Sequence, residues 1–416
     1  MALVIKKTLL YQLLFASCVA VPYINNYELT FAVWSLTTLL TLQSKYSWGI
    51  TKQLLCYGAI LLIAAVVLLF KEYERYYIIR DFTYIAKPIL GLLIGYQLCK
   101  RIPHLAIQTV AHTAFFLALI HFFLVFRGFV FFKASSINDL RYYAGYFSDY
   151  EIYALIILIF HQKFELHFTK KRVRIYIIAV ALSSFLYLSR TNFIQFFILF
   201  FALKGYFVLN RRLIIVVASI VIVSSIGYSA ILYINPKRNG PGLEAFLYKI
   251  KVAPIEPFKT KINRGDWKDF NDNYRSHENI ITARQVTREG KYSVLFGQGL
   301  GSKVDLKQKI WLGDMILRYI SILHNGFMTV FLKSGLLGVA FLLVSIFFLF
   351  KNPKSEIPMV KQINYLMVGS GLFMFVSCWV FMGFYFTADT KSIFLGFIIC
   401  FREILIKQHQ NSTPHD

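Results

Sequence analysis

Long apolar runs separated by short polar connections dominate the pattern of this chain. A scan with a window of about 19 residues, suited to membrane-spanning helices, finds roughly twelve such runs. They lie near residues 8–22, 29–43, 54–70, 83–99, 105–126, 150–164, 175–190, 194–209, 213–234, 324–350, 363–386 and 393–406. One large polar segment, 235–322, interrupts the pattern. We therefore predict an all-α polytopic membrane protein with about twelve transmembrane helices and one large, partly helical outer loop.

This pattern divides the chain into three parts. Residues 1–234 would hold transmembrane helices 1–9, residues 235–322 the large loop, and residues 323–416 helices 10–12 and a cytoplasmic tail. Composition excludes a soluble protein, because 57% of the 416 residues are hydrophobic and the mean hydropathy is +0.56. All five cysteines fall within apolar runs, so we interpret them as small buried hydrophobes and expect neither disulfides nor a zinc site.

The basic residues of the short connections predict how the helices are oriented. With the amino terminus in the cytoplasm, the inner connections hold most of these residues, and the outer connections 23–28, 191–193 and 387–391 hold almost none. Of the short outer connections, only 71–82 and 127–149 carry several. The inner ones are Lys45, Lys52, Lys100, Arg101, Lys170, Lys171, Arg172, Arg174, Arg211, Arg212, Lys351, Lys354 and Lys361. These basic residues account for much of the net charge of +24, and their expected role is to anchor the protein against anionic lipids. Nucleic-acid binding is therefore not needed to explain the charge. The segment 235–322 then faces outward.

The outward segment 235–322 has its own composition. It contains 16 basic and 9 acidic residues, a net charge of +7, which suits a negatively charged ligand or lipid headgroups. Its first part reads as irregular, with a short amphipathic stretch around residues 243–252, and a helix is predicted from Arg275 to a stop at Gly290. The run LFGQGLGS that follows belongs to no βαβ pattern, so we interpret its glycines as a sharp turn returning the chain to the membrane.

Candidate chemistry gathers at the outer boundary of the apolar runs. His324 opens the tenth run, Arg190 ends the seventh, and Arg141 lies in a third outer loop with Gly145 and Asp149. Arginine binds phosphate oxygens with two hydrogen bonds, and histidine can take a proton from a hydroxyl near neutral pH. This combination suggests group transfer from a lipid pyrophosphate to an alcohol. Asp266, Asp269 and Asp272 are separated along the chain and interleaved with basic residues, so we expect no metal site, and we expect no cofactor either.

The motif around His324 resembles the signature of the O-antigen ligase family and its polymerase relatives. His324 and Asn325, followed by Gly335 and Gly338, meet the spacing His-[Asn/Ser/Gln]-x9-Gly-x-x-Gly. About twelve spans, a large loop near the carboxyl end and the position of the motif at its re-entry are similar too. Arg190 in LSRTNF resembles the arginine at the outer end of a central helix in that family.

Arg275 in YRSHEN resembles the second arginine of the family, in the large loop. The gap from Arg275 to the glycine turn is longer than is usual there, which makes Arg284 the alternative. We favour Arg275 because Glu278 could hold its guanidinium in place. We expect Gly335 and Gly338 to be small residues that let helices approach closely.

The resemblance implies a GT-C-like, metal-independent, inverting glycosyltransferase. Its expected donor is a glycan on undecaprenyl pyrophosphate, its acceptor a lipid A–core sugar or another glycan, and its location the bacterial inner membrane with the active site facing the periplasm. It implies that His324, Arg190 and Arg275 are catalytic, whereas Asn325 caps the helix or orients His324. The substrate-binding candidates are Arg141, Arg284, Arg288 and Asn325. Arg284 and Arg288, four residues apart on one helix, would repel unless an anion lay between them.

Three alternatives stay open. A polymerase of O-antigen or exopolysaccharide would use the same donor, and a protein hydroxyl could be the acceptor. A transporter of lipid-linked glycans would also need arginines, but it predicts charges near the middle of the membrane and broken helices in matching halves. O-antigen ligation in lipopolysaccharide biosynthesis is the interpretation that we favour, and no residue in the sequence identifies the acceptor.

Overall fold

The computed structural model describes most of the chain. It covers residues 2–133, 137–145, 148–187, 189–207, 211–238, 243–252, 273–312, 315–350 and 355–412, with 259, 261–263, 265–266 and 269–270. Asp272 and parts of the predicted irregular stretch before it lie outside these residues.

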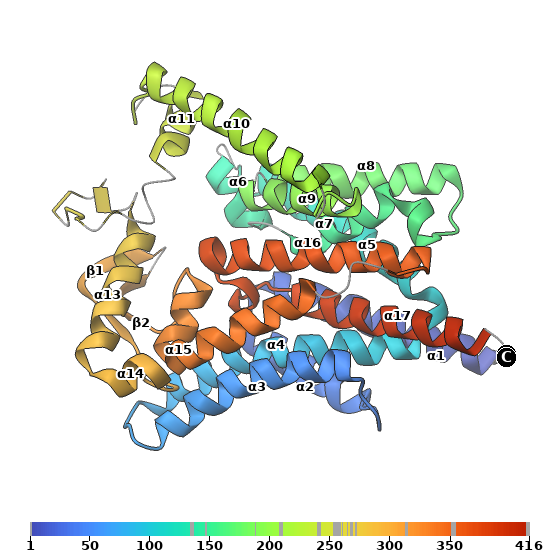
Figure 1. Cartoon of the computed structure of the whole chain (residues 1–416), viewed down its shortest axis with the longest axis horizontal. Helices are drawn as coiled ribbons and strands as arrows, with labels where there is room; N and C mark the ends of the chain where they lie inside the picture. The colour runs from blue at the N-terminus through green and yellow to red at the C-terminus, as the bar shows by residue number, and fades with distance from the viewer. Residues whose placement is uncertain are drawn as a thin grey trace.

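Helices build nearly all of the described chain (Figure 1). Every one of the twelve predicted apolar runs coincides with a helix: α1 (Ala2–Ala20), α2 (Tyr27–Leu40), α3 (Trp48–Leu68), α4 (Arg75–Arg101), α5 (Ala106–Val130), α7 (Asp149–Ile159), α8 (Lys170–Leu186), α9 (Arg190–Leu203), α10 (Arg211–Ile234), α15 (Gly326–Phe347), α16 (Pro358–Phe381) and α17 (Lys391–Ser412). Shorter helices connect them: η1 (Val21–Ile24), η2 (Pro103–Leu105), α6 (Ile137–Ala144), η3 (His161–Phe164), η5 (Phe348–Phe350) and η6 (Gly383–Tyr385).

Six helical segments of the described chain are long and apolar enough to cross a membrane. They are Lys7–Ile24, Trp48–Leu68, Arg75–Arg101, Pro103–Val130, Gly326–Phe350 and Pro358–Phe381. Two shorter apolar helices, Arg190–Leu203 and Val221–Ile234, accompany them. The chain is thus a membrane-embedded helical protein, and the count of twelve crossings stays a prediction.

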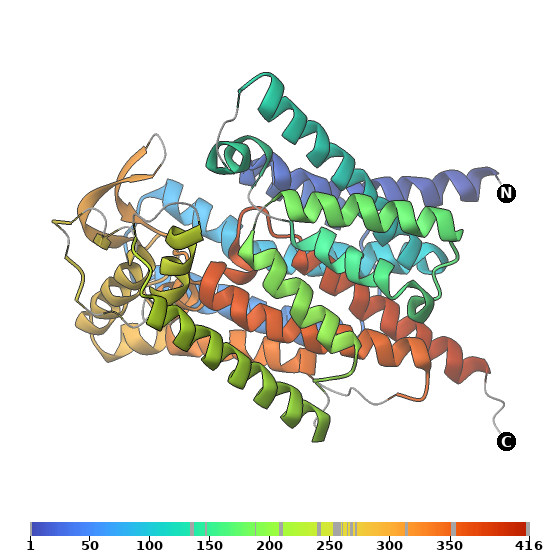
Figure 2. The ribbon, with the colours of Figure 1, turned by 90° about the horizontal axis from the view of Figure 1, so that it is seen from above.

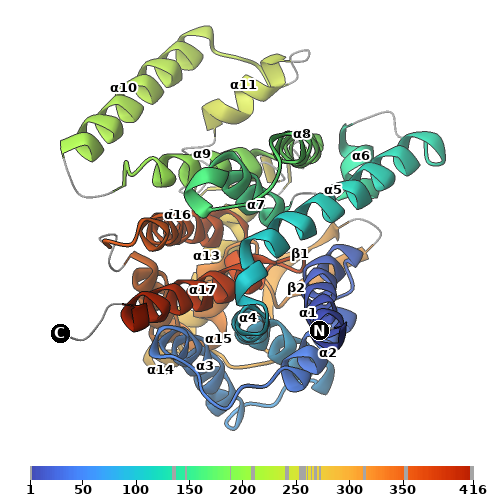
Figure 3. The same cartoon turned by 90° about the vertical axis from the view of Figure 1, so that its right-hand side faces the viewer.

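Helix α4 forms the centre of the bundle. The end-on view in Figure 3 places it beside α17, with α1, α2 and α3 around it, and α4 packs against all four. Gly95 and Gly396 allow α4 and α17 to touch backbone to backbone, since a Cβ at either position would overlap a main-chain carbonyl of the other helix. All five cysteines are buried and free, as the apolar pattern predicted.

The large loop contains a small domain of its own at one end of the bundle. Both ends of the chain lie at the opposite end of the bundle (Figure 2). The orientation of the loop across the membrane stays a prediction. After α11 (Leu243–Val252), the chain forms α13 (Tyr274–Arg288) and α14 (Lys291–Phe296). Helix α13 lies where the sequence predicted one, and α11 coincides with the short amphipathic stretch in the segment that was read as irregular.

A β-hairpin was not predicted. Strands β1 (Val304–Leu312) and β2 (Met315–Ile320) pair antiparallel, with Val304 opposite Ile320. One face of the hairpin, α13 and the start of α15 share a small hydrophobic core made of Phe270, Ile281, Val286, Val304, Leu306, Ile310, Ile320, Leu323 and Leu332. This core fixes α13 directly above the beginning of α15.

Candidate functional site

The segment before α15 is held in place by its own side chains. Asn325 is the N-cap of α15, and its side-chain oxygen accepts a hydrogen bond from the Met328 amide at 3.1 Å. The buried Thr329 hydroxyl hydrogen-bonds to both the amide and the carbonyl of Leu323, at 3.1 and 3.3 Å. The capping role predicted for Asn325 is confirmed, and His324 sits on a backbone that is fixed on both sides.

His324 meets Glu278 of α13. The His324 Nδ1 lies 3.0 Å from Glu278 Oε1 and 3.1 Å from Oε2, and the His324 backbone amide donates to Oε2 at 3.1 Å. The Glu278 side chain is 1% exposed, whereas that of His324 is 37% exposed. The buried Glu278 carboxylate therefore binds the Nδ1 side of the imidazole, and the imidazole remains partly exposed to solvent.

This geometry determines which imidazole nitrogen can react. A carboxylate only accepts hydrogen bonds, so Glu278 holds the proton on Nδ1 and leaves the lone pair on Nε2. Among the described residues, Nε2 of His324 has no hydrogen-bond partner. An exposed Nε2 on an imidazole oriented by a carboxylate is the arrangement of a general base.

Tyr274 packs against the imidazole of His324. Its ring meets that of His324 edge to face, with 5.6 Å between centroids and 83° between planes. Burial, reinforced by the nearby Glu278 carboxylate, raises the pKa of Tyr274 far above its usual value. The phenol therefore stays protonated and cannot compete with His324 as a base. Since Tyr274 and Glu278 are four residues apart, one face of α13 presents both.

Gly335 breaks α15 one turn before the second glycine of the motif. Its φ of 62° is non-helical, and a Cβ there would overlap the backbone at Leu295 and Gly297. The break frees the Leu332 and Lys333 carbonyls, which accept hydrogen bonds from the Gln298 and Gly299 amides at 2.8 and 3.1 Å. The expected close approach at Gly335 is confirmed, but its partner is the glycine loop rather than a second membrane helix.

The glycine loop does more than turn the chain toward the membrane. Its Leu300 amide bonds to the Ala64 carbonyl of α3 at 3.2 Å, and its Gly301 amide bonds to the Asp81 carboxylate of α4 at 2.7 Å. The hairpin then follows before the chain re-enters the membrane at α15. The sequence interpretation was therefore incomplete, because this loop joins three helices.

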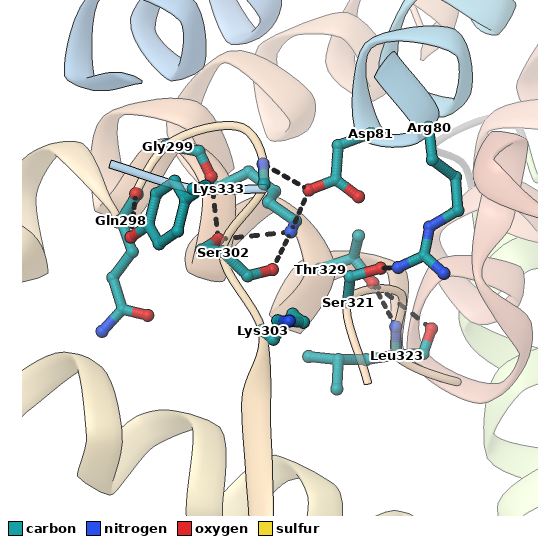
Figure 4. Close-up of polar contacts among 12 residues, drawn as sticks. Arg80, Asp81, Gln298, Gly299, Ser302, Lys303, Ser321, Leu323, Thr329 and Lys333 are labelled. Carbon is teal, nitrogen blue, oxygen red and sulfur yellow. Dashed lines mark hydrogen bonds and ion pairs between the residues drawn. The ribbon is translucent and has the colours of Figure 1, made fainter. Parts of the chain in front are cut away.

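A buried ion pair lies beneath the loop (Figure 4). Lys333 Nζ is 2.5 Å from Asp81 Oδ2 and 2.5 Å from the Ser302 carbonyl, and both charged side chains are fully buried. Since both partners sit in apolar helices, the pair costs desolvation, which its hydrogen bonds offset in part; Asp81 Oδ1 has no hydrogen-bond partner among the described residues. It links α4, α15 and the segment leading into β1.

The predicted arginines do not gather around His324. Arg190 is the exposed first residue of α9, and Arg275, Arg284 and Arg288 are exposed on α13. Within the described part of the chain, none of these four forms a hydrogen bond with His324. We had expected Glu278 to hold the guanidinium of Arg275. Its carboxylate instead accepts hydrogen bonds from His324. Arg141 is half-buried in α6.

Asp149 also differs from expectation. Instead of facing an outer loop, it is a fully buried residue at the start of α7, 2.6 Å from Lys391 Nζ. Lys391 bonds to Asp389 as well, at 2.9 Å, and Lys87 donates to the Phe386 and Thr387 carbonyls. A second buried group of charges therefore lies inside the bundle, distant in sequence from the His324 motif.

The sequence reasoning passed over these buried charges. The signal that could have revealed them is an ionisable residue inside an apolar run, as at Lys87 and Lys333, or directly before one, as at Asp81. Their partners could not be read from the sequence, because Asp81 and Lys333 are separated by most of the chain.

In comparisons with known proteins, no family model and no curated sequence matches this chain. The interpretation of the site therefore rests on its residues and geometry.

Proposed function

We propose that this chain is a membrane glycosyltransferase that moves a glycan from undecaprenyl pyrophosphate to a sugar hydroxyl. O-antigen ligation to lipid A–core is the specific reaction that we favour. In this proposal the protein lies in a bacterial inner membrane with the His324 site facing the periplasm. The observation that carries the proposal is the pair of Glu278 and His324, which leaves an oriented Nε2 open at the start of a membrane helix.

The chemistry follows from that geometry. Nε2 of His324 takes the proton of the acceptor hydroxyl, and the hydroxyl oxygen forms a bond to the anomeric carbon of the donor. The bond from that carbon to the pyrophosphate oxygen breaks on the opposite face, so the configuration inverts. The electron pair leaves with the lipid pyrophosphate, whose growing charge needs cationic groups nearby. Glu278 acts through His324 as a positioning residue.

Purified protein in detergent tests this proposal. With a lipid-linked glycan and a lipid A–core acceptor, we expect a glycosylated acceptor and one undecaprenyl pyrophosphate released per bond formed. The His324→Ala variant should produce neither. If the donor alone is extended into longer lipid-linked chains, the protein is the polymerase rather than the ligase. Full transfer by His324→Ala would remove the proposed base.

A transporter of lipid-linked glycans is the second candidate. Two observations favour it: the buried charges around Lys391 and Lys333, and the break in α15 at Gly335. Detergent separates the two functions, because a transporter has no compartments to connect in a micelle. Transfer in detergent supports the enzyme. Glycan movement across sealed vesicles, without a new glycosidic bond, supports the transporter.

A further inference from the structure

Arg80 is the basic side chain that reaches the segment leading into His324. It belongs to the second turn of α4, and its guanidinium donates to the Ser321 hydroxyl, three residues before His324 (Figure 4). Its Cζ lies 4.8 Å from the ring centroid of Tyr77 and 5.7 Å from that of Tyr76. The guanidinium is therefore fixed by a hydroxyl on one side and by aromatic rings on the other.

The charge of Arg80 has no partner in the described part of the chain. The neighbouring Asp81 points instead to Lys333 and the Gly301 amide. No carboxylate lies within ion-pair distance of Arg80, and its Nε is buried without a hydrogen-bond partner. A half-buried guanidinium that has lost water without gaining an anion is unfavourable, and an anionic ligand would relieve that cost.

A second cation lies against the same aromatic ring. Lys303 Nζ is 3.8 Å from the centroid of Tyr77, and its counter-charge is the largely exposed Glu74, at 3.0 Å. Lys303 immediately precedes β1, whereas Arg80 comes from α4. Two elements far apart in sequence therefore bring positive charge to one place beside the approach to His324.

We propose that Arg80, with Lys303 and Tyr77, forms the binding position for the diphosphate group of the lipid-linked donor. This assignment rests on the proposed function and names the cations that the leaving group meets. The planar guanidinium of Arg80 offers two parallel hydrogen bonds to phosphate oxygens once a ligand replaces Ser321 or binds beside it. This assignment replaces the expectation that Arg190 and Arg275 bind the pyrophosphate. Both are exposed, and among the described residues neither forms a hydrogen bond with His324.

Binding measurements on the full chain test this assignment without requiring turnover. The probes are geranylgeranyl pyrophosphate, geranylgeranyl monophosphate and geranylgeraniol, titrated against protein in nanodiscs of a zwitterionic lipid. We expect Arg80→Gln to weaken pyrophosphate binding by about 10- to 100-fold, the size of a charge-assisted contact. Geranylgeraniol should bind wild type and variant equally.

Two further variants control for charge and folding. Arg75→Gln removes the same charge from an exposed position of the same helix and should leave binding within about twofold, because that site is screened by water. Ser321→Ala removes the contact made by Arg80 but keeps its charge, so it should bind pyrophosphate at least as tightly as wild type. If Arg80→Gln does not fold, weaker binding by Ser321→Ala would overturn the assignment.

The results separate this inference from the proposed reaction. His324→Ala should retain pyrophosphate binding while losing transfer. Wild-type affinity in a folded Arg80→Gln variant, in a protein that transfers glycans, would refute the role of Arg80 and leave the transferase intact. Arg80-dependent pyrophosphate binding in a protein that forms no glycosidic bond would support the site and refute the reaction. Equal binding of pyrophosphate and of anionic-lipid vesicles by wild type would reduce Arg80 to a general lipid contact and overturn its role toward the donor.

Discussion

Replacing Glu278 by glutamine perturbs the proposed site with the smallest change in shape. The wild-type carboxylate accepts from two donors of the same residue, Nδ1 and the backbone amide of His324. A glutamine keeps one acceptor oxygen and puts an NH₂ group in place of the other. Since Oε2 alone lies 3.1 Å from both donors, an amide oxygen in its place can still accept from both. The NH₂ group in the place of Oε1 instead donates toward Nδ1, which favours the tautomer with the proton on Nε2 and removes the base.

The size of the effect follows from these contacts. A positioned general base contributes about 10²- to 10⁴-fold to a rate. We therefore expect Glu278→Gln to lower kcat by a factor of about 10² to 10⁴. KM for the donor should change little, because Glu278 is buried and does not reach the ligand. Loss of one charge-assisted hydrogen bond would also lower stability by about 1.5–3 kcal/mol, so unfolding must be measured alongside activity.

The assay compares initial rates of Glu278→Gln with those of Glu289→Gln, in the same detergent and over the same range of donor concentrations. Glu289 follows α13 and pairs with Lys71 in an exposed ion pair, so its variant should keep kcat within about twofold. A folded Glu278→Gln protein with the wild-type kcat would show that the pair with His324 has no part in catalysis.

Three more predictions concern the frame of the site. Lys333→Met should lower stability by about 3–5 kcal/mol in thermal or denaturant unfolding, because it leaves Asp81 buried without its cation; a second substitution, Asp81→Leu, should restore most of that loss. Gly335→Ala should give a protein that unfolds at lower temperature, since an alanine pays about 1–3 kcal/mol for the positive φ and also overlaps the glycine loop; unchanged melting would refute the break in α15. Hydrogen bonds from Arg318 hold the pKa of Asp305 below its usual value of 3.8, so this pair stabilises the hairpin fully above pH 3.8 and less as pH falls. Amide exchange of the hairpin, corrected for intrinsic rates, should show that acid sensitivity in wild type and not in Asp305→Asn.

The helices of the bundle could be predicted from sequence because their signal is local. A run of apolar residues needs no partner to be recognised, and all twelve runs coincide with helices, six of the described segments being long and apolar enough to cross a bilayer. The same holds for α13, where a polar face and a glycine stop define the helix, and for Asn325, whose type and position fit an N-cap.

The hairpin was missed although its sequence carries a signal. Residues 304–320 contain two runs rich in Val, Ile, Leu and Tyr, and the Gly313-Asp314 dipeptide between them is typical of a tight turn. Basic residues interleaved with the apolar ones made this stretch look like ordinary loop. The polar side of the hairpin faces water, whereas Val304, Leu306 and Ile320 enter the small core beside α13.

The partners of charged residues were beyond sequence reasoning for a different reason. Arg275 and Glu278 are close in sequence, so a contact between them was a natural expectation. Tertiary packing instead presents Glu278 to His324, because α13 lies across the start of α15. The same packing brings Arg80 to Ser321, a contact that no local pattern encodes.

One measurement tests the central claim most directly: formation of a glycosidic bond by the purified protein in detergent, compared between wild type and His324→Ala. The account predicts that the wild type converts the lipid-linked donor into product and releases undecaprenyl pyrophosphate, and that the folded variant produces neither above background. Equal product from both proteins, or none from a folded wild type supplied with donor and with either class of acceptor, would contradict it.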